Sequence, residues 1–131
     1  MICGCSKSST DNSTGSSTTE NFTGTFVRRT DSDTTAGGGS FSGTLNRTTQ
    51  QLTYTVSWHT LTSIPVEMHF HDAGPVIIQV TGFTVATAGS LSGTAHFTSS
   101  QIDDMEAGSI YFMIHTERYT DGEIVAVLHK E

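Results

Sequence analysis

The sequence predicts an all-β domain, a two-sheet Greek-key sandwich or a barrel, with one short helix. Thr and Phe are abundant and favour strands, whereas the good helix formers Ala, Leu, Glu and Lys are scarce. Alternating apolar and polar residues mark about eight short segments, which are separated by frequent turn signals. With 131 residues, the chain has the length of one domain.

The N-terminal residues 1–21 are predicted to be a disordered Ser/Thr-rich tether, and residues 22–131 to be the β domain. Residues 6–20 contain no apolar side chain that could offset the entropy of ordering them. From Phe22 onward the alternation predicts strands over residues 22–28, 41–45, 52–58, 67–71, 76–80, 91–97, 110–116 and 123–129. Capping hydroxyls from Thr98 and a closing Gly108 predict the helix between them.

The segment 67–71 carries the most informative side chains. Glu67, His69 and His71 alternate with Met68 and Phe70. Residues two apart on a strand share a face and lie about 6.5 Å apart. Both imidazoles therefore lie beside a carboxylate on one face, while the apolar residues enter the core.

The segment 110–116 has the same alternation and carries His115. If the two strands lie near each other, His69, His71 and His115 can bind one transition-metal ion, for which imidazole is a common ligand; copper and zinc are the expected metals. Met113 shares the face of His115 and is either a soft copper ligand or a packing residue. The alternative is structural, with the imidazoles hydrogen-bonding to backbone or carboxylate groups to fix turns. Nearby acids could ligate the metal or support its ligands: Glu67, Asp72, Asp121 and Glu123.

The net charge and the absence of common catalytic motifs limit the classes of function that the sequence supports. The net charge of −7 argues against a nucleic-acid partner and favours a cationic ligand or a metal. The sequence contains no G-x-S-x-G, P-loop, dinucleotide-binding glycine motif or H-E-x-x-H. No apolar run approaches the length of a membrane span. The sequence therefore predicts no catalytic activity.

Both cysteines lie at the N-terminus, in the stretch Ile2-Cys3-Gly4-Cys5. This stretch resembles the end of a bacterial lipoprotein signal, in which a small residue precedes the lipidated cysteine, so Cys5 is the expected lipidation site. Only Met1 stands where a charged and then an apolar region would be expected. The alternative is a polar tail with incidental cysteines.

Three motifs, in order, resemble the CHRD domain, a module named after chordin and also found in bacterial secreted proteins. They are His69-Phe70-His71 followed by Gly74-Pro75-Val76, then Ala107-Gly108 leading into Ile110–Thr116, and finally Gly122-Glu123-Ile124. Val125 departs from the arginine of the family pattern. The resemblance implies an immunoglobulin-like sandwich distantly similar to copper/zinc superoxide dismutase and an extracytoplasmic location. It implies no defined activity.

The sequence thus leads to three hypotheses. The first is an extracytoplasmic binding module for an unidentified protein partner or a metal ion, held to the membrane only through an N-terminal lipid. The second is a metal-dependent redox enzyme similar to superoxide dismutase. The third is a purely structural adhesion module.

Overall fold

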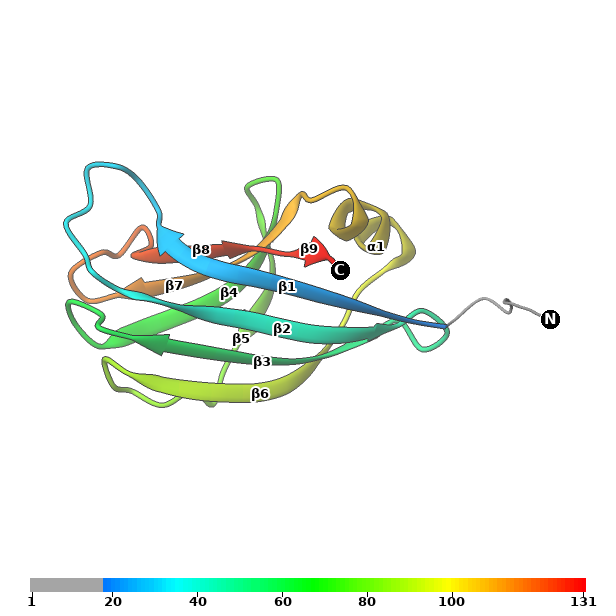
Figure 1. Ribbon diagram of the computed structural model, residues 1–131, viewed down its shortest axis with the longest axis horizontal. Helices are drawn as coiled ribbons and strands as arrows, with labels where there is room; N and C mark the ends of the chain where they lie inside the picture. The colour runs from blue at the N-terminus through cyan, green and yellow to red at the C-terminus, as the bar shows by residue number, and fades with distance from the viewer. Residues whose placement is uncertain (1–17) are drawn as a thin grey trace.

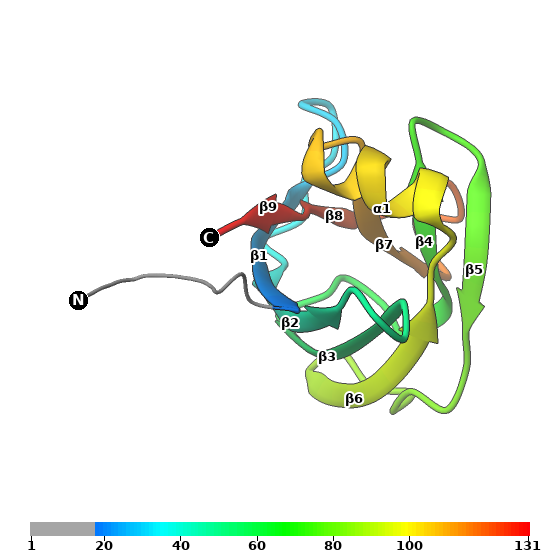
Figure 2. The ribbon, with the colours of Figure 1, turned by 90° about the vertical axis from the view of Figure 1, so that its right-hand side faces the viewer.

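The computed structural model describes residues 18–131 as an antiparallel, nearly closed β-barrel with one short helix (Figures 1 and 2). The all-β prediction with a single helix is confirmed, in its barrel form. The elements are β1 (Thr19–Arg28), β2 (Gly38–Asn46), β3 (Gln51–His59), β4 (Pro65–Asp72), β5 (Val76–Val80), β6 (Gly89–His96), α1 (Ser99–Glu106), β7 (Ile110–Thr116), β8 (Ile124–Val127) and β9 (His129–Lys130). The predicted lipidation site Cys5 and most of the predicted tether lie outside the described residues, and β1 begins ahead of Phe22.

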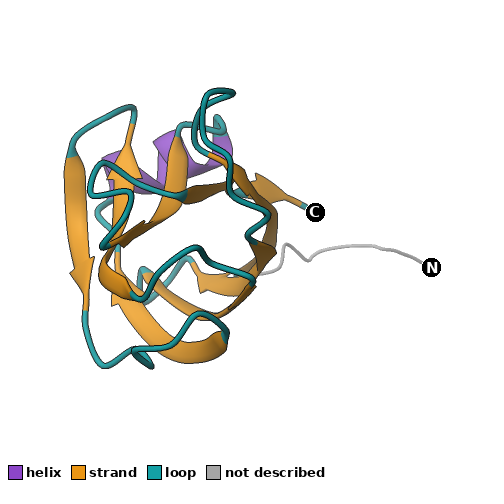
Figure 3. Cartoon of the chain, turned by 90° about the vertical axis from the view of Figure 1, so that its left-hand side faces the viewer, coloured by secondary structure: helices purple, strands orange, loops and turns teal. Residues whose placement is uncertain are grey.

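The strand order is β5-β4-β7-β8-β1-β2-β3-β6, and β9 pairs with β1 beside β8. Viewed from one end, these strands surround a central core (Figure 3). No ladder joins β5 to β6, so the barrel has a seam between these two strands. This order places β4 next to β7, and therefore places the segments of the predicted histidine site side by side.

Phenylalanine rings dominate the core. The alternation of β3 puts its apolar residues inside and its Thr and Ser residues outside, as predicted. Five phenylalanine side chains are fully buried or nearly so: Phe22, Phe41, Phe70, Phe97 and Phe112. All of them except Phe22 form edge-to-face or tilted ring pairs in the core. Such packing makes the barrel a filled core and leaves the outer face of the sheet for polar groups.

The helix α1 begins at a capping box. The Thr98 hydroxyl accepts a hydrogen bond from the Gln101 amide, and the Gln101 side chain accepts one from the Thr98 amide. Ile102 and Met105 are buried against the barrel. No helix among residues 18–131 is long and apolar enough to span a membrane.

The predicted final strand over residues 123–129 is divided into β8 and β9. At Leu128 the chain leaves the β8 ladder, and the Leu128 amide donates to the Ile110 carbonyl. β8 lies between β7 and β1, and its outward-facing residues Val125 and Val127 are half-buried.

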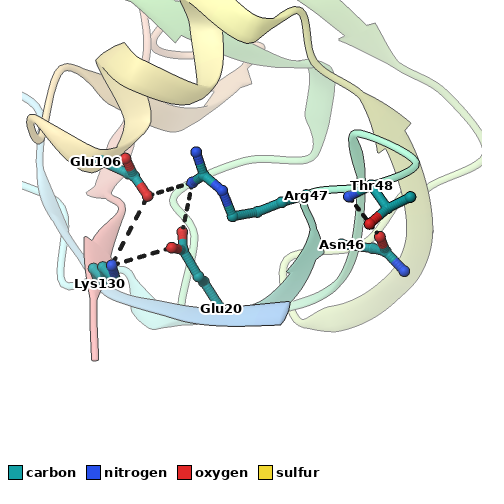
Figure 4. A network of polar contacts seen from close by, with 6 residues as sticks. All are labelled: Glu20, Asn46, Arg47, Thr48, Glu106 and Lys130. Carbon is teal, nitrogen blue, oxygen red and sulfur yellow. Dashed lines mark hydrogen bonds and ion pairs between the residues drawn. The ribbon is translucent and has the colours of Figure 1, made fainter. Parts of the chain in front are cut away.

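Ion pairs connect several elements at the end of the barrel that lies near the helix (Figure 4). Arg47 contacts Glu20 at 3.2 Å and Glu106 at 2.5 Å, and Lys130 contacts the same acids at 3.1 and 3.8 Å. These residues come from β1, the β2–β3 turn, α1 and β9. Exposed pairs contribute little singly, but the network joins four separate elements.

Candidate metal centre

The three predicted histidines meet on the outer face of the barrel wall. Antiparallel pairing of β4 and β7 sets His69 opposite Met113 and Glu67 opposite His115. Each histidine offers a ring nitrogen, and these atoms all lie within 4.8 Å of one another. The predicted convergence of imidazoles from two strands is therefore present.

All three imidazoles are buried although they point away from the core. Their exposed fractions are 8% for His69, 7% for His71 and 8% for His115. The ring of His71 stacks on Tyr111, with centroids 4.9 Å apart and planes 3° from parallel. Because water has little access, the polar atoms of these rings need partners within the protein or from a ligand.

Backbone carbonyls determine which nitrogen carries the proton in two of the rings. His71 Nδ1 lies 2.8 Å from the Gly74 carbonyl oxygen, and His115 Nδ1 lies 2.9 Å from that of Thr120. A carbonyl oxygen can only accept, so both Nδ1 atoms are protonated and donate. In the neutral rings, both Nε2 atoms consequently present lone pairs, as metal-ligating histidines do.

The Nε2 lone pairs of His71 and His115 differ in their surroundings. His115 Nε2 lies 3.3 Å from His69 Nδ1, which donates a hydrogen bond to it. His71 Nε2 is buried and has no hydrogen-bond partner, and it is the only such side-chain atom in the described part of the chain. A buried acceptor without a donor is costly, and an absent ion is one of its ordinary explanations.

The distance between the first pair of nitrogens fits a metal. Two imidazole nitrogens bound to zinc at about 2.0–2.1 Å with tetrahedral angles lie about 3.3–3.4 Å apart. His69 Nδ1 and His115 Nε2 are already 3.3 Å apart. Coordination requires the His69 proton to move from Nδ1 to Nε2, and it requires a small approach of His71.

The electrostatics favour neutral ligands. Burial, and next the positive charge that His115 can carry, lower the pKa of His69, whereas the Glu67 carboxylate opposes this shift. His69 is therefore uncharged at neutral pH and can give a lone pair to a cation. Glu67 is exposed at the margin of the cluster and adds negative charge there, as its place in the strand pattern predicted.

The other predicted acids do not join the cluster of ligand atoms. Asp72 lies beyond His71; burial and, next, a hydrogen bond with Asp104 raise the pKa of Asp72 to about 6. Asp121 is exposed in the loop after β7. Met113 packs against Gly122, where an added Cβ would lie 2.3 Å from the methionine sulfur. Met113 is a packing residue under this loop, which was the second of the two roles expected for it.

The Glu123 carboxylate lies in a buried hydrogen-bond network of its own. Glu123 is fully buried, and its carboxylate accepts hydrogen bonds from the Thr35 hydroxyl at 2.5 Å, the Thr116 hydroxyl at 2.7 Å, and the Thr62 amide and hydroxyl at 2.8 Å each. With four donors its lone pairs are occupied, so Glu123 is a structural residue and the expectation of a metal-supporting role for it is wrong. The sequence signal that could have found it is the apolar stretch directly following an acid in Gly122-Glu123-Ile124.

The remaining histidines stay apart from the site. His59, His96 and His129 are exposed. They provide matched controls for the buried three.

Comparison with known families agrees with this architecture. Residues 18–125 match the model of the CHRD domain. Searches of curated proteins and of solved structures each returned no match to this chain. The matched region contains all three buried histidines and Glu123, and covers most of the chain. The chain therefore belongs to the CHRD domain family.

Proposed function

We propose that this CHRD domain is an extracytoplasmic binding module that holds one transition-metal ion, zinc or copper, at His69, His71 and His115, and that it has no catalytic activity of its own. The observation that carries the proposal is the buried, unpartnered Nε2 of His71. It lies near one ring nitrogen of His69, on the same strand, and one ring nitrogen of His115, on the neighbouring strand β7.

Three features support a metal over a purely structural role. The carbonyls of Gly74 and Thr120 hold two rings with their Nε2 lone pairs free to coordinate. The 3.3 Å separation already suits a tetrahedral site. The net charge of −7 attracts cations. The structural alternative accounts for the carbonyl bonds, but it leaves the His71 Nε2 without a partner.

Burial of the ligands supports binding without catalysis. A metal ion at side chains that are less than a tenth exposed has limited contact with a reactant in solution. Three protein ligands leave a fourth position, which water or the nearby Glu67 carboxylate can fill. A redox enzyme would need that position to be open to its substrate.

The test is metal analysis of the full chain without a histidine tag. Cys3 and Cys5 are replaced by Ser, because their thiols would bind zinc or copper independently. After removal of metal by chelation, the protein is titrated with Zn²⁺ and, under reducing conditions, with Cu⁺. We expect one equivalent to bind at micromolar concentration or below, and superoxide dismutase activity to be absent.

The variants H69A, H71A and H115A are compared with H96A, which removes an exposed histidine. We expect each of the first three to lose more than about 100-fold in affinity and H96A to lose nothing. Absence of stoichiometric binding to the folded parent overturns the metal proposal. Metal-dependent superoxide consumption would overturn its non-catalytic part and favour the redox enzyme.

The extracytoplasmic location is part of the proposal and is supported by the stretch Ile2-Cys3-Gly4-Cys5, which resembles a lipidation signal. Expression of the native gene in its own host, followed by mass spectrometry of the N-terminal peptide, tests it. A diacylglyceryl thioether on Cys5 is the expected result. An unmodified Cys5 in a cytoplasmic fraction would contradict both the anchor and the extracytoplasmic location.

A further inference from the structure

The seam between β5 and β6 is the one break in the barrel wall that residues 18–131 form. The Cα atoms of these strands stay more than 8 Å apart over most of their length. Paired strands lie about 4.8 Å apart, so β5 and β6 are too far apart over most of their length to pair directly with each other.

The main-chain groups that face the seam have no strand partner. β5 pairs only with β4, and β6 pairs only with β3. Each strand consequently presents a row of N–H and C=O groups at its free edge. Such edges are templates for an added strand, and proteins usually protect them with charged residues, proline or bulges.

Protection by charged residues is missing here, although β5 carries a bulge at Ile77 and follows directly after Pro75. Neither Val76–Val80 nor Gly89–His96 contains Asp, Glu, Lys, Arg or Pro, although the chain as a whole carries a net charge of −7. Val76 is 50% exposed, and Ile78 and Leu91 are half-buried. The chemistry of the seam therefore matches an uncharged segment with apolar side chains.

A cavity of about 220 Å³ lies in the seam. Ile78 and Val80 line it from β5, and Leu91 and Ala95 line it from β6. All four lie on the inward face of the sheet, because each pairs with a core residue of the neighbouring strand. Polar residues line the cavity as well, among them Gln79, Ser92 and Thr94. Side chains on one face of an added strand would contact the four inward-facing apolar residues.

A tyrosine hydroxyl that reaches the cavity without a hydrogen-bond partner supports the same assignment. Tyr54 is 5% exposed, lines the cavity and forms no hydrogen bond within the described residues. Its hydroxyl passes over Gly93, where an added Cβ would lie 3.2 Å from the oxygen. The absence of a side chain at Gly93 thus lets this hydroxyl reach toward the seam, where it can bond to the backbone of an occupant.

We propose that the β5–β6 seam binds an extended, uncharged segment of another polypeptide, which pairs with the free strand edges, places alternate apolar side chains on Ile78 and Leu91, and bonds to the Tyr54 hydroxyl. This is strand addition, in which main-chain hydrogen bonds give affinity and side-chain contacts, here with Ile78 and Leu91, give specificity. The site is separate from the histidine cluster and does not require a metal.

The probe is a synthetic peptide that copies residues 75–81, an uncharged sequence rich in β-branched residues, with two lysines at each end for solubility. A control peptide has the same sequence and charge but N-methyl groups on alternate amides, which remove the donors needed for pairing. Binding to the full chain is followed by amide NMR shifts and hydrogen exchange at physiological salt. We expect new protection of amides in β5 and β6 with the first peptide and none with the second.

Protein variants test the individual contacts. L91D places a charge in the seam and should abolish binding, whereas V85D places the same charge at a 61% exposed position outside both strands and should leave binding unchanged. Y54F removes a single oxygen and should weaken binding about fivefold. Since Y54F retains the core ring, it tests the proposal even if L91D does not fold.

Several results would overturn the assignment. These are equal binding of the methylated peptide, protection outside β5 and β6, unchanged affinity in Y54F together with L91D, and no binding of either peptide. If protection of the β5 and β6 amides grows with protein concentration in the absence of peptide, a second copy of this chain occupies the seam. That result would contradict binding of a segment from another polypeptide.

Discussion

His115 and Thr116 are neighbours on β7, yet they belong to two buried polar clusters of opposite character. Thr116 donates to Glu123, whose carboxylate receives four hydrogen bonds from three separate segments. His115 belongs to the histidine cluster, in which the Nε2 of His71 has no partner. We call the Glu123 group, with Thr35, Thr62 and Thr116, the glutamate knot.

This difference in hydrogen bonding indicates a structural role for the glutamate knot and a ligand-binding role for the histidine cluster. A fully satisfied buried carboxylate stabilises the fold and has no capacity left for a ligand. A cluster with an unsatisfied lone pair gives up stability in the free protein and regains it when an ion binds. We therefore expect changes in the glutamate knot to alter unfolding of the metal-free protein, and changes in the three histidines to alter it mainly when metal is bound.

The largest expected effect on the metal-free protein follows from Glu123→Gln. The glutamine amide would present N–H donors to threonine donors, so the knot loses acceptors without changing shape. We expect the metal-free protein to lose about 3 kcal/mol of stability in urea unfolding. A loss below about 1 kcal/mol would contradict the structural role of the knot.

The second effect follows from His71→Phe, which keeps a ring against Tyr111 and removes the unpartnered nitrogen. We expect metal-free stability to change by less than about 1 kcal/mol, because the lost bond to Gly74 and the removed buried acceptor offset each other. With Zn²⁺ at about 1,000 times its Kd, the parent should gain about 4 kcal/mol and the variant nothing. Equal stabilisation of both proteins would place the metal elsewhere.

The pH dependence of the metal-free protein gives a smaller effect. The pKa of His69 is lowered in the folded state, mainly by burial, so its stabilising contribution is present above the unfolded value of 6.5. The contribution is lost as the pH falls below that value. We expect the melting temperature of the parent to decline between pH 7 and pH 5, and the decline to be shallower in His69→Asn. Identical profiles would contradict the burial of a neutral His69.

The smallest effect concerns Asp104 on α1, beside the turn that follows His71. Burial and then Asp104 raise the pKa of Asp72 to about 6, so the shared proton stabilises the pair below that pH and its benefit is lost as the pH rises through it. Asp104→Asn should raise the melting temperature at pH 8 and leave it unchanged or lower at pH 4.5. Because these carboxyl groups are only half-buried and water still screens them, the change should stay below about 1 kcal/mol.

The sequence predicted the parts of this molecule that depend on local periodicity. A two-residue repeat was enough to put His69 and His71 on one face and to assign Met68 and Phe70 to the core. The convergence of His115 followed from the same alternation together with the pairing of β4 and β7. Thr98 and Gly108 marked the helix because capping is also local.

The sequence did not predict features created by distant segments. The glutamate knot joins Thr35, Thr62 and Thr116, which are spread over the chain and are indistinguishable from the many other threonines. Neither the division of β8 from β9 nor the seam beside β5 leaves a periodic signal. The missing partner of His71 Nε2 is a property of its full surroundings and can be read only from coordinates.

The most direct test of the metal site is ¹⁵N NMR of the histidine rings, with Cys3 and Cys5 replaced by Ser. On addition of one equivalent of Zn²⁺, we predict that the Nε2 resonances of His71 and His115 and the Nδ1 resonance of His69 shift to metal-bound values, while those of His59, His96 and His129 stay unchanged. Unmoved resonances of the three buried rings, or equal shifts in the exposed ones, would contradict the account.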